Sequence, residues 1–317
     1  MPALPGGPTA GSPGSPARIG SYPVGMVTVD LVDASRGTPA NATAPALDHR
    51  NLPTWIWYPA AGDAGSEPAK PSTRDGAAPR DGRFPIVLFG HGVTGRAIYY
   101  QAVLQAWASA GYIVVAPDFP LSNADTLGGP TVSDVGQQPA DMSFILSQLL
   151  GANPPGSAAA VVAHLDPEHI AIAGHSLGAI TALSAGFGVC CAEPRVDAVV
   201  DWAGAIYPLL EKPSPDPKID DLPLLIVHGD ADGTVPYRQG KEVFAKVHTP
   251  RWFITLIDGE HIPPYLSGLA DQQSMLTTVA TLDFLDAQLK GDKQGMARLT
   301  SLVDSAGPEV ATLEKAR

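Results

Sequence analysis

The chain has 317 residues, of which 44% are apolar and only 16% charged, and its 32 acidic and 20 basic side chains give a net charge of −12. The acidic balance argues against a nucleic-acid or anionic-membrane partner, because both need a basic surface, and no apolar run reaches the ~18 residues of a membrane-spanning helix. The only two cysteines, Cys190 and Cys191, cannot form a disulfide framework that stabilises a chain of this length. Because they are adjacent, a disulfide between them would be strained, so we expect two small buried thiols and no metal site.

The first twenty residues contain five prolines and five glycines and no helix or strand pattern, which predicts a disordered leader over residues 1–23. A leader of this composition favours a secreted or cell-envelope protein whose signal has been removed, with a cytoplasmic location still open. Two segments rich in β-branched and aromatic residues follow, Val24–Asp33 and Leu52–Tyr58, and are expected to be strands. The segment 59–83 has no large apolar side chain and therefore predicts a long surface loop.

From Phe84 onward, short apolar segments alternate with helical patterns. The expected strands are Ile86–Phe89, Tyr112–Ala116, Ile170–Ala173, Val196–Val200, Leu224–Val227 and Trp252–Ile257, and the expected helices are Ala97–Ala110, Pro139–Leu150, Ser176–Gly186, Arg238–Val247 and Ser274–Leu289. Strands that alternate with helices pair in parallel through right-handed crossovers. We therefore expect one α/β domain over residues 24–290, with a mostly parallel central sheet and helices on both faces, followed by a polar tail over residues 291–317.

The pentapeptide Gly174-His175-Ser176-Leu177-Gly178 has the pattern G-x-S-x-G and stands between an expected strand and an expected helix. In that context the glycines allow a sharp turn that exposes the serine hydroxyl above the sheet edge. The amides of the first helical turn point to the same place, where they favour a developing anion. Ser176 is therefore the candidate nucleophile, and His175 is expected to pack beside it.

A nucleophilic serine needs a histidine base and a carboxylate that orients this base. His261 follows the last expected strand, at the edge where α/β sheets gather their functional loops, and is the expected base. Three aspartates at strand ends are candidates for the acid: Asp232 and Asp230 after one strand, and Asp201 after the strand before it. Because the first aspartate of a Gly-Asp-x-Asp-Gly turn tends to cap that turn, Asp232 is favoured, and Asp201 stays open as the alternative.

Acyl transfer also needs two N–H groups that bind the oxyanion of its tetrahedral intermediate. The amide of Leu177, directly after the serine, is one expected donor. The segment Gly90-His91-Gly92-Val93-Thr94-Gly95 follows an expected strand, and its glycines let the backbone approach a substrate closely, so the Val93 amide is the expected second donor. Three residues on loops at the same edge are candidates for substrate contact: Trp202, Tyr207 and Thr234.

Taken together, the motifs resemble those of the α/β-hydrolase superfamily, over about residues 24 to 289. They are Gly90-His91-Gly92-Val93-Thr94-Gly95, Gly111-Tyr112 with Ala116-Pro117-Asp118, Gly174-His175-Ser176-Leu177-Gly178, His228-Gly229 with Asp232 and Val235-Pro236, and Gly259-Glu260-His261. Within the superfamily the chain is similar to the branch of dienelactone-hydrolase-like enzymes, platelet-activating-factor acetylhydrolases and cutinase-like polyester hydrolases. This resemblance implies an α/β-hydrolase fold and ester hydrolysis through an acyl-enzyme, without a metal or an organic cofactor.

The branch contains competing patterns for the acid and the substrate. In polyester hydrolases the acid is the second carboxylate of a motif like Asp230-Ala231-Asp232, whereas in the acetylhydrolases it follows the preceding strand, in a stretch similar to Val200-Asp201-Trp202. Polyester hydrolases also place an aromatic residue where this chain has Val93, and they carry a C-terminal disulfide that this chain cannot form. We expect a small or polymeric ester with a short to medium acyl group as substrate. A phospholipid ester hydrolase and a non-catalytic binding protein of the same fold are the alternatives, and the oligomeric state stays open.

Overall fold

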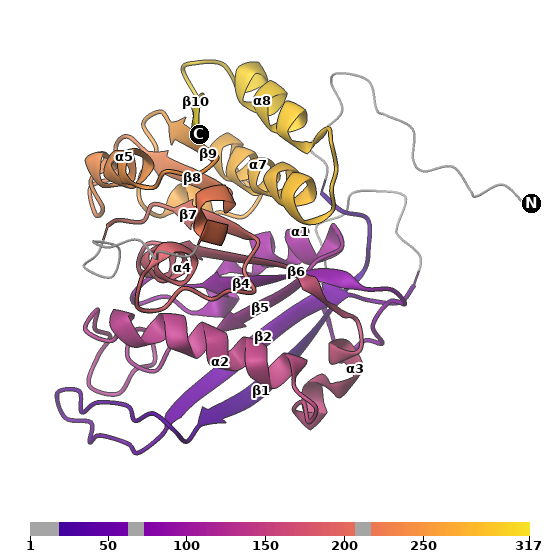
Figure 1. The fold of residues 1–317 in the computed structure, drawn as a ribbon, viewed down its shortest axis with the longest axis vertical. Helices are drawn as coiled ribbons and strands as arrows, with labels where there is room; N and C mark the ends of the chain where they lie inside the picture. The colour runs from indigo at the N-terminus through magenta and orange to yellow at the C-terminus, as the bar shows by residue number, and fades with distance from the viewer. Residues whose placement is uncertain (1–18, 63–72, 207–216) are drawn as a thin grey trace, which may run out of the picture.

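The computed structural model describes residues 19–62, 73–206 and 217–317. These residues form a ten-stranded sheet with the order β10-β9-β8-β7-β6-β4-β5-β2-β1-β3, which runs through the middle of the molecule (Figure 1). The strands are β1 (Val24–Asp33), β2 (Arg50–Pro59), β3 (Thr73–Asp75), β4 (Phe84–Gly90), β5 (Ile113–Pro117), β6 (Leu165–His175), β7 (Ala198–Trp202), β8 (Leu224–Gly229), β9 (Arg251–Leu256) and β10 (Ala311–Ala316). From β5 to β9 the neighbours are parallel, so their carboxyl ends share one edge. Antiparallel pairing adds β2 and β1 on one side and β10 on the other.

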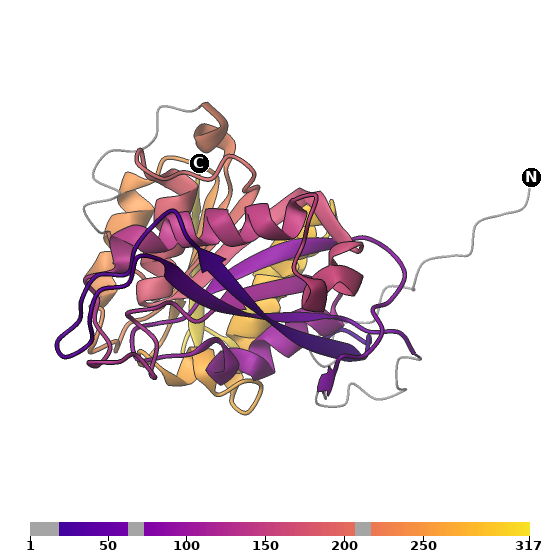
Figure 2. The same ribbon diagram turned by 90° about the horizontal axis from the view of Figure 1, so that it is seen from below.

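Helices cover both faces of the sheet, as Figures 1 and 2 show. They are α1 (Gln101–Ser109), α2 (Gln138–Leu150), α3 (Ala159–Val162), α4 (Leu177–Phe187), α5 (Tyr237–Lys246), α6 (Pro263–Leu266), α7 (Gln272–Leu289) and α8 (Gly295–Ala306). Helices α1, α7 and α8 pack on one face, together with Val87 and Phe89 of β4. Helices α2, α4 and α5 pack on the other, together with Ile86 and Leu88. Because successive strand residues point to opposite faces, an interior strand covered on both sides is apolar throughout, and the predicted α/β architecture is confirmed.

All the strands and helices expected between Phe84 and Leu289 are present, with ends shifted by a few residues. The predicted polar tail over residues 291–317 is wrong. This segment contains α8, whose Leu299 and Val303 are buried, and β10, which pairs with β9. Apolar residues three and four positions apart give α8 one apolar stripe, which docks on α7 and makes the segment part of the domain.

The segment 59–83 is also more structured than the predicted surface loop. Ala60 is fully buried and pairs with Pro79 across an isolated bridge, and β3 pairs in parallel with β1. Strand pairing uses backbone groups, so it does not require the large apolar side chains that this segment lacks. The central part of the expected loop, residues 63–72, lies outside the described residues.

The predicted leader over residues 1–23 extends too far. Its residues 1–18 lie outside the described part of the chain, but Tyr22 donates its amide to the carbonyl of Ser109 at 3.0 Å and packs edge-on against Phe84. The guanidinium of Arg80 lies over the Tyr22 ring, 4.5 Å from its centroid. Because of these contacts, the packed domain begins a few residues before Val24.

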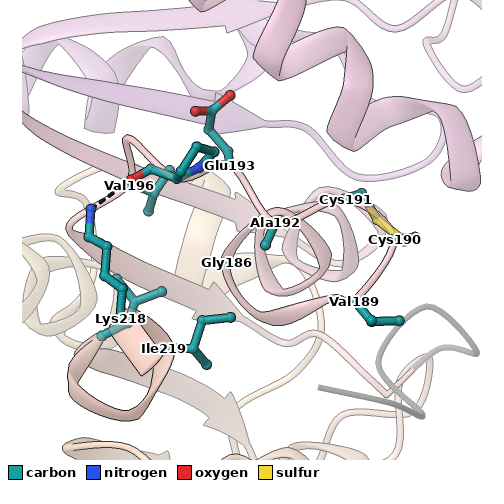
Figure 3. Close-up of a pocket in the computed structure, with 11 residues that line it drawn as sticks. Gly186, Val189, Cys190, Cys191, Ala192, Glu193, Val196, Lys218 and Ile219 are labelled. Carbon is teal, nitrogen blue, oxygen red and sulfur yellow. Dashed lines mark hydrogen bonds between the residues drawn. A yellow bond between two sulfur atoms is a disulfide. The ribbon is translucent and has the colours of Figure 1, made fainter. Parts of the chain in front are cut away.

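The two cysteines correct the expectation of buried free thiols. Cys190 and Cys191 are joined by a disulfide in the turn after α4, where Cys190 is exposed and Cys191 is half-buried. A pocket of about 290 Å³ opens beside them, between the end of α4 and the start of β7 (Figure 3). That is the sheet edge opposite the carboxyl ends of the parallel strands, so this pocket is separate from the site described next.

Candidate active site

Ser176 occupies a tight turn between β6 and α4. Its backbone has φ 56° and ψ −118°, a left-handed conformation that is strained for a residue with a side chain. Neighbouring glycines make the turn possible: a Cβ on Gly178 would lie 2.0 Å from the carbonyl oxygen of Gly90, and one on Gly174 would lie 2.2 Å from the carbonyl carbon of Gly178. The serine therefore stands at the carboxyl edge of the sheet and at the N-terminus of an 11-residue helix, the place that the motif predicts.

Three side chains from three separate segments form a hydrogen-bonded series at this edge. His261, after β9, has its Nε2 2.9 Å from Ser176 Oγ and its Nδ1 2.6 Å from Oδ2 of Asp232, which lies after β8. None of the three residues is more than 7% exposed. A carboxylate only accepts, so Nδ1 of the neutral imidazole carries the proton, and Nε2 presents a lone pair to the hydroxyl. This is the arrangement that a general base requires.

Asp232 is held on both of its oxygens. Oδ1 accepts the amides of Thr234 and Val235, each at 2.8 Å, while Oδ2 faces His261 and, at 3.4 Å, Nε2 of His228. Burial alone raises the pKa of the Asp232 carboxyl, but the hydrogen bonds from His228 and His261 outweigh it and hold this pKa well below its usual range. The base is therefore backed by a carboxylate that stays ionised.

The other two aspartates considered from the sequence have different partners. Asp201, at the end of β7, is fully buried and accepts the amide of Gly204 at 2.7 Å. Burial raises the pKa of Asp201 to about 6, against the opposing effects of His228 and the Gly204 amide. Asp230 accepts the amide of Asp258 at 2.7 Å. The structure brings Asp232 to His261 and uses Asp201 and Asp230 to hold backbone.

The glycine-rich loop after β4 lies against the serine. A Cβ on Gly92 would be only 3.2 Å from Ser176 Cβ, so the Gly92–Val93 peptide lies beside the hydroxyl. Its carbonyl oxygen accepts hydrogen bonds from His91 Nδ1 at 2.7 Å and from the Gly95 amide at 2.9 Å. Two donors on the carbonyl fix the peptide plane and, with it, the direction of the Val93 N–H on the opposite side. That geometry suits the expected oxyanion donor.

The second expected donor, the Leu177 amide, belongs to the first residue of α4, where helix geometry leaves N–H groups without intrahelical partners. The Val93 side chain packs against a small apolar cluster of Val135, Leu177 and Ile180. Leu177 directly follows Ser176, and the loop that carries Val93 lies against the serine, so both expected donor residues are next to the nucleophile.

The three residues expected to contact substrate are not all placed at the site. Trp202 corrects the prediction: it is fully buried, packs against Trp107, and donates its indole N–H to Thr281 at 3.2 Å. As a member of β7 rather than of the loop after it, Trp202 points into the core beneath the sheet edge. Tyr207 lies outside the described residues. Thr234 is exposed, and the structure uses its amide, rather than its side chain, to hold the acid.

Two further residues of the site were not assigned a role from sequence. His91 fixes the Gly92 carbonyl, and its position between two loop glycines was a usable signal. Tyr100 accepts the Gly92 amide at 3.1 Å and lies 2.7 Å from His175 Nδ1. No local pattern marks Tyr100, because it reaches the site only through the tertiary packing of the 3₁₀ turn η1 (Ala97–Tyr100).

Within the described ranges, none of the helices combines the length and apolar composition needed to cross a bilayer. Across the same residues, no three His, Cys, Asp or Glu side chains are grouped so that they could hold a metal ion.

Comparison with known proteins gives a match of part of the chain to one family, two relatives and a similar solved structure. Residues 65–202 match the Chlorophyllase family, a range that includes Ser176 and ends before Asp232 and His261. Two curated relatives are both called Uncharacterized protein YfhR. The Salmonella typhi protein is 28% identical over 145 residues, 38% of this chain and 50% of that protein. The Salmonella typhimurium protein is 28% identical over 127 residues, 32% and 44% of the two chains. The chain spans about half the length of these relatives.

A solved structure covers the whole domain. The chain is similar to ferulic acid esterase from Streptomyces cinnamoneus, with a TM-score of 0.68 and 23% identity, over 96% of this chain and 98% of that one. Because nearly all of both chains is included, the similarity concerns the complete fold rather than a shared motif. The sheet order, the serine turn between β6 and α4, the Chlorophyllase match and this structural similarity agree. The chain therefore has an α/β-hydrolase fold like that of the esterase, and its residues 65–202 are similar to the Chlorophyllase family.

Proposed function

We propose that the protein is a serine carboxylic-ester hydrolase that works through an acyl-enzyme. The observation that carries this proposal is the series Ser176, His261 and Asp232, with 2.9 Å and 2.6 Å between its polar atoms, at the N-terminus of α4. A serine hydroxyl is a weak nucleophile by itself. The series supplies what it lacks, a base within hydrogen-bond reach and an anion that orients and stabilises this base.

In the acylation step, His261 Nε2 takes the hydroxyl proton while Ser176 Oγ bonds to the ester carbonyl carbon. The carbonyl electron pair moves to oxygen, and the resulting oxyanion accepts hydrogen bonds from the amides of Val93 and Leu177. The imidazolium, stabilised by Asp232, then gives its proton to the leaving alcohol oxygen. The bond from carbon to that oxygen breaks, and the acyl group stays on the serine.

Deacylation repeats the sequence with water. His261 takes a proton from the water as its oxygen attacks the acyl carbon, and the same two amides hold the second oxyanion. Ser176 Oγ then leaves the carbon and regains its proton from His261. One water is consumed, and the ester becomes an acid and an alcohol. These side chains, the ester and the water supply every proton and electron pair of both steps.

Two exposed apolar side chains next to site residues in the sequence support an apolar substrate. Ile262, directly after the base, is 49% exposed, and Tyr99, directly before the buried Tyr100, is 50% exposed. Large apolar side chains that remain exposed beside a buried polar site are typical of ligand contacts. We therefore propose short to medium acyl esters, including aliphatic polyester chains. The valine at position 93 offers no aromatic platform, so the site is less suited to aromatic polyesters.

Hydrolysis of p-nitrophenyl esters from acetate to palmitate tests the proposal, with wild type, Ser176→Ala and Ser184→Ala compared. Ser184 is a matched control, because it is a buried serine of α4 whose hydroxyl donates to the Ile180 carbonyl at 2.7 Å. We expect Ser176→Ala to lose at least about 10³-fold in kcat, and Ser184→Ala to stay within about threefold of wild type. A fluorophosphonate should add its mass to wild type and Ser184→Ala only. The proposal is overturned if wild type hydrolyses none of these esters, or if the fluorophosphonate still labels Ser176→Ala.

A further inference from the structure

A second hydrogen-bonded chain runs behind the catalytic series. The Gly92 amide donates to Tyr100 Oη at 3.1 Å, Tyr100 Oη lies 2.7 Å from His175 Nδ1, and His175 Nε2 lies 2.8 Å from the backbone carbonyl oxygen of His261. Tyr100 and His175 are 2% and 1% exposed. The chain therefore begins in the glycine-rich loop, directly before the Val93 donor, and ends on the backbone of the base.

The proton positions in this chain follow from its two ends. The His261 carbonyl can only accept, so His175 Nε2 must carry the imidazole proton. Nδ1 of the neutral ring is then unprotonated and accepts the Tyr100 O–H. The Tyr100 oxygen in turn accepts the Gly92 amide. Every hydrogen bond thus points from the glycine-rich loop toward the base, and no polar atom of the two side chains is without a partner.

Both side chains are also fixed in their neutral forms. Burial, with a smaller repulsion from His261, lowers the pKa of His175 to about 3. Burial likewise raises the pKa of Tyr100 above its ordinary value, against the hydrogen bond from Gly92. The direction of the chain therefore stays the same around neutral pH.

The chain joins parts of the molecule that sheet pairing keeps apart. The glycine-rich loop follows β4 and the His261 loop follows β9, and β6, β7 and β8 lie between these two strands. We propose that Tyr100 and His175 are positioning residues, which hold the oxyanion loop and the base loop at a fixed separation on either side of Ser176. Neither side chain needs to touch substrate for this role. The kinetic part of the proposal rests on the proposed esterase function.

The first test compares Tyr100→Phe with Tyr112→Phe on p-nitrophenyl butyrate. Tyr112 is a matched control, since it is a fully buried tyrosine whose hydroxyl donates to Asp286 at 2.7 Å, at the amino-end edge of β5 and away from the site. Rates are taken per active site, counted by fluorophosphonate titration. Deleting an oxyanion donor costs about 10²–10³-fold, and loosening the loop that carries one should cost less. We expect about a tenfold fall in kcat for Tyr100→Phe, with KM nearly unchanged, and no such fall for Tyr112→Phe.

A double-mutant cycle with His175→Asn tests whether the two residues act as one chain. The asparagine oxygen can take the place of Nδ1, but nothing then reaches the His261 carbonyl. Because either change cuts the same chain, the double variant should be no slower than the slower single variant. The proposal is overturned if the kcat losses of the two single variants multiply in the double variant. It is also overturned if Tyr112→Phe loses as much kcat as Tyr100→Phe, or if the loss in Tyr100→Phe lies only in KM or only in the number of titratable sites.

Nitrogen NMR of histidine-labelled protein tests the chain without any activity. His175 should give the signals of a neutral ring protonated on Nε2, unchanged from about pH 5 to about pH 9, whereas an ordinary histidine titrates near 6.5. A ring protonated on Nδ1, or one that titrates in this range, would refute the chain even if the esterase proposal stands. If wild type hydrolyses no ester but His175 shows the expected tautomer, the function fails and the hydrogen-bonded chain remains.

Discussion

Replacing Asp232 by asparagine is a sharp test of the base, because the structure dictates how the amide must lie. Oδ1 accepts the Thr234 and Val235 amides at 2.8 Å each. Only the oxygen of an asparagine can accept them, so its NH₂ group must take the place of Oδ2, 2.6 Å from His261 Nδ1. Since the NH₂ group donates, Nδ1 has to accept. The imidazole proton then sits on Nε2 and faces Ser176 Oγ.

In that tautomer Nε2 cannot take the hydroxyl proton, and the anion that stabilises the imidazolium is gone. We expect kcat for p-nitrophenyl butyrate to fall about 10⁴-fold, the effect of this tautomer reversal in a Ser-His-Asp series. At 1.36 kcal/mol for each factor of ten, the loss corresponds to about 5.5 kcal/mol of transition-state stabilisation. The amide keeps its contacts with Thr234, Val235 and His261 but loses the one with His228 Nε2, so thermal unfolding must show that the variant is still folded at the assay temperature.

Asp201→Asn is the matched control for this experiment. Asp201 is an equally buried strand-end aspartate, and an asparagine there can keep the Gly204 amide through Oδ1. We expect Asp201→Asn to stay within about threefold of wild type. The reasoning is refuted if folded Asp232→Asn keeps more than about a tenth of wild-type kcat, or if Asp201→Asn loses as much as Asp232→Asn. The second outcome would move the acid to the strand end that the acetylhydrolase pattern uses.

Three further predictions concern stability. The raised pKa of Asp201 means that the folded state binds this proton more tightly than the unfolded chain. From about pH 4 to about pH 6, the free energy of unfolding of wild type should therefore fall by up to about 1.4 kcal/mol per pH unit as pH rises. Urea unfolding should show this slope in wild type and not in Asp201→Asn. Gly178→Ala places a methyl group 2.0 Å from the Gly90 carbonyl oxygen, so it should lower the unfolding temperature and abolish ester turnover, and a normal unfolding temperature would contradict the close approach. Leu299→Ala, at a fully buried site, should cost about 2–4 kcal/mol in urea unfolding, clearly more than Leu302→Ala at a half-buried one; equal losses would argue against the docking of α8.

The parts of the site that could be predicted from sequence are those marked by local patterns. The G-x-S-x-G turn and the histidine after the last parallel strand each depend on a few consecutive residues and on their place after a strand. The acid stayed open because Asp201, Asp230 and Asp232 all follow strands that end at the same edge. Choosing among them needs the direction of each carboxylate, which the loop backbone sets. The two amides that hold Asp232 Oδ1 decide it, and no residue pattern encodes them.

The errors arise where a contact depends on distant packing. Trp202 was expected on a loop, but β7 runs two residues past the expected end at Val200, so Trp202 points to the same core face as Val200. The segment after residue 290 is polar on average, yet Leu299 and Val303 share one face of α8 and find α7 beside them. The mean polarity of a segment does not reveal such an apolar stripe. Where these helices pack on the sheet depends on tertiary contacts, which no local sequence pattern specifies.

His175, the residue directly before Ser176 in the G-x-S-x-G turn, shows how packing, rather than residue type, completes the site. His175 and His261 have ring centroids only 4.8 Å apart. If His175 were also charged when His261 becomes an imidazolium, the two charges would repel by about 3 kcal/mol at an effective dielectric constant of ~20, which is more than two orders of magnitude in rate. Burial prevents this by lowering the pKa of His175 to about 3. A second histidine can therefore lie beside the base, donate to its backbone, and leave the whole positive charge of the transition state to the ring that faces Asp232.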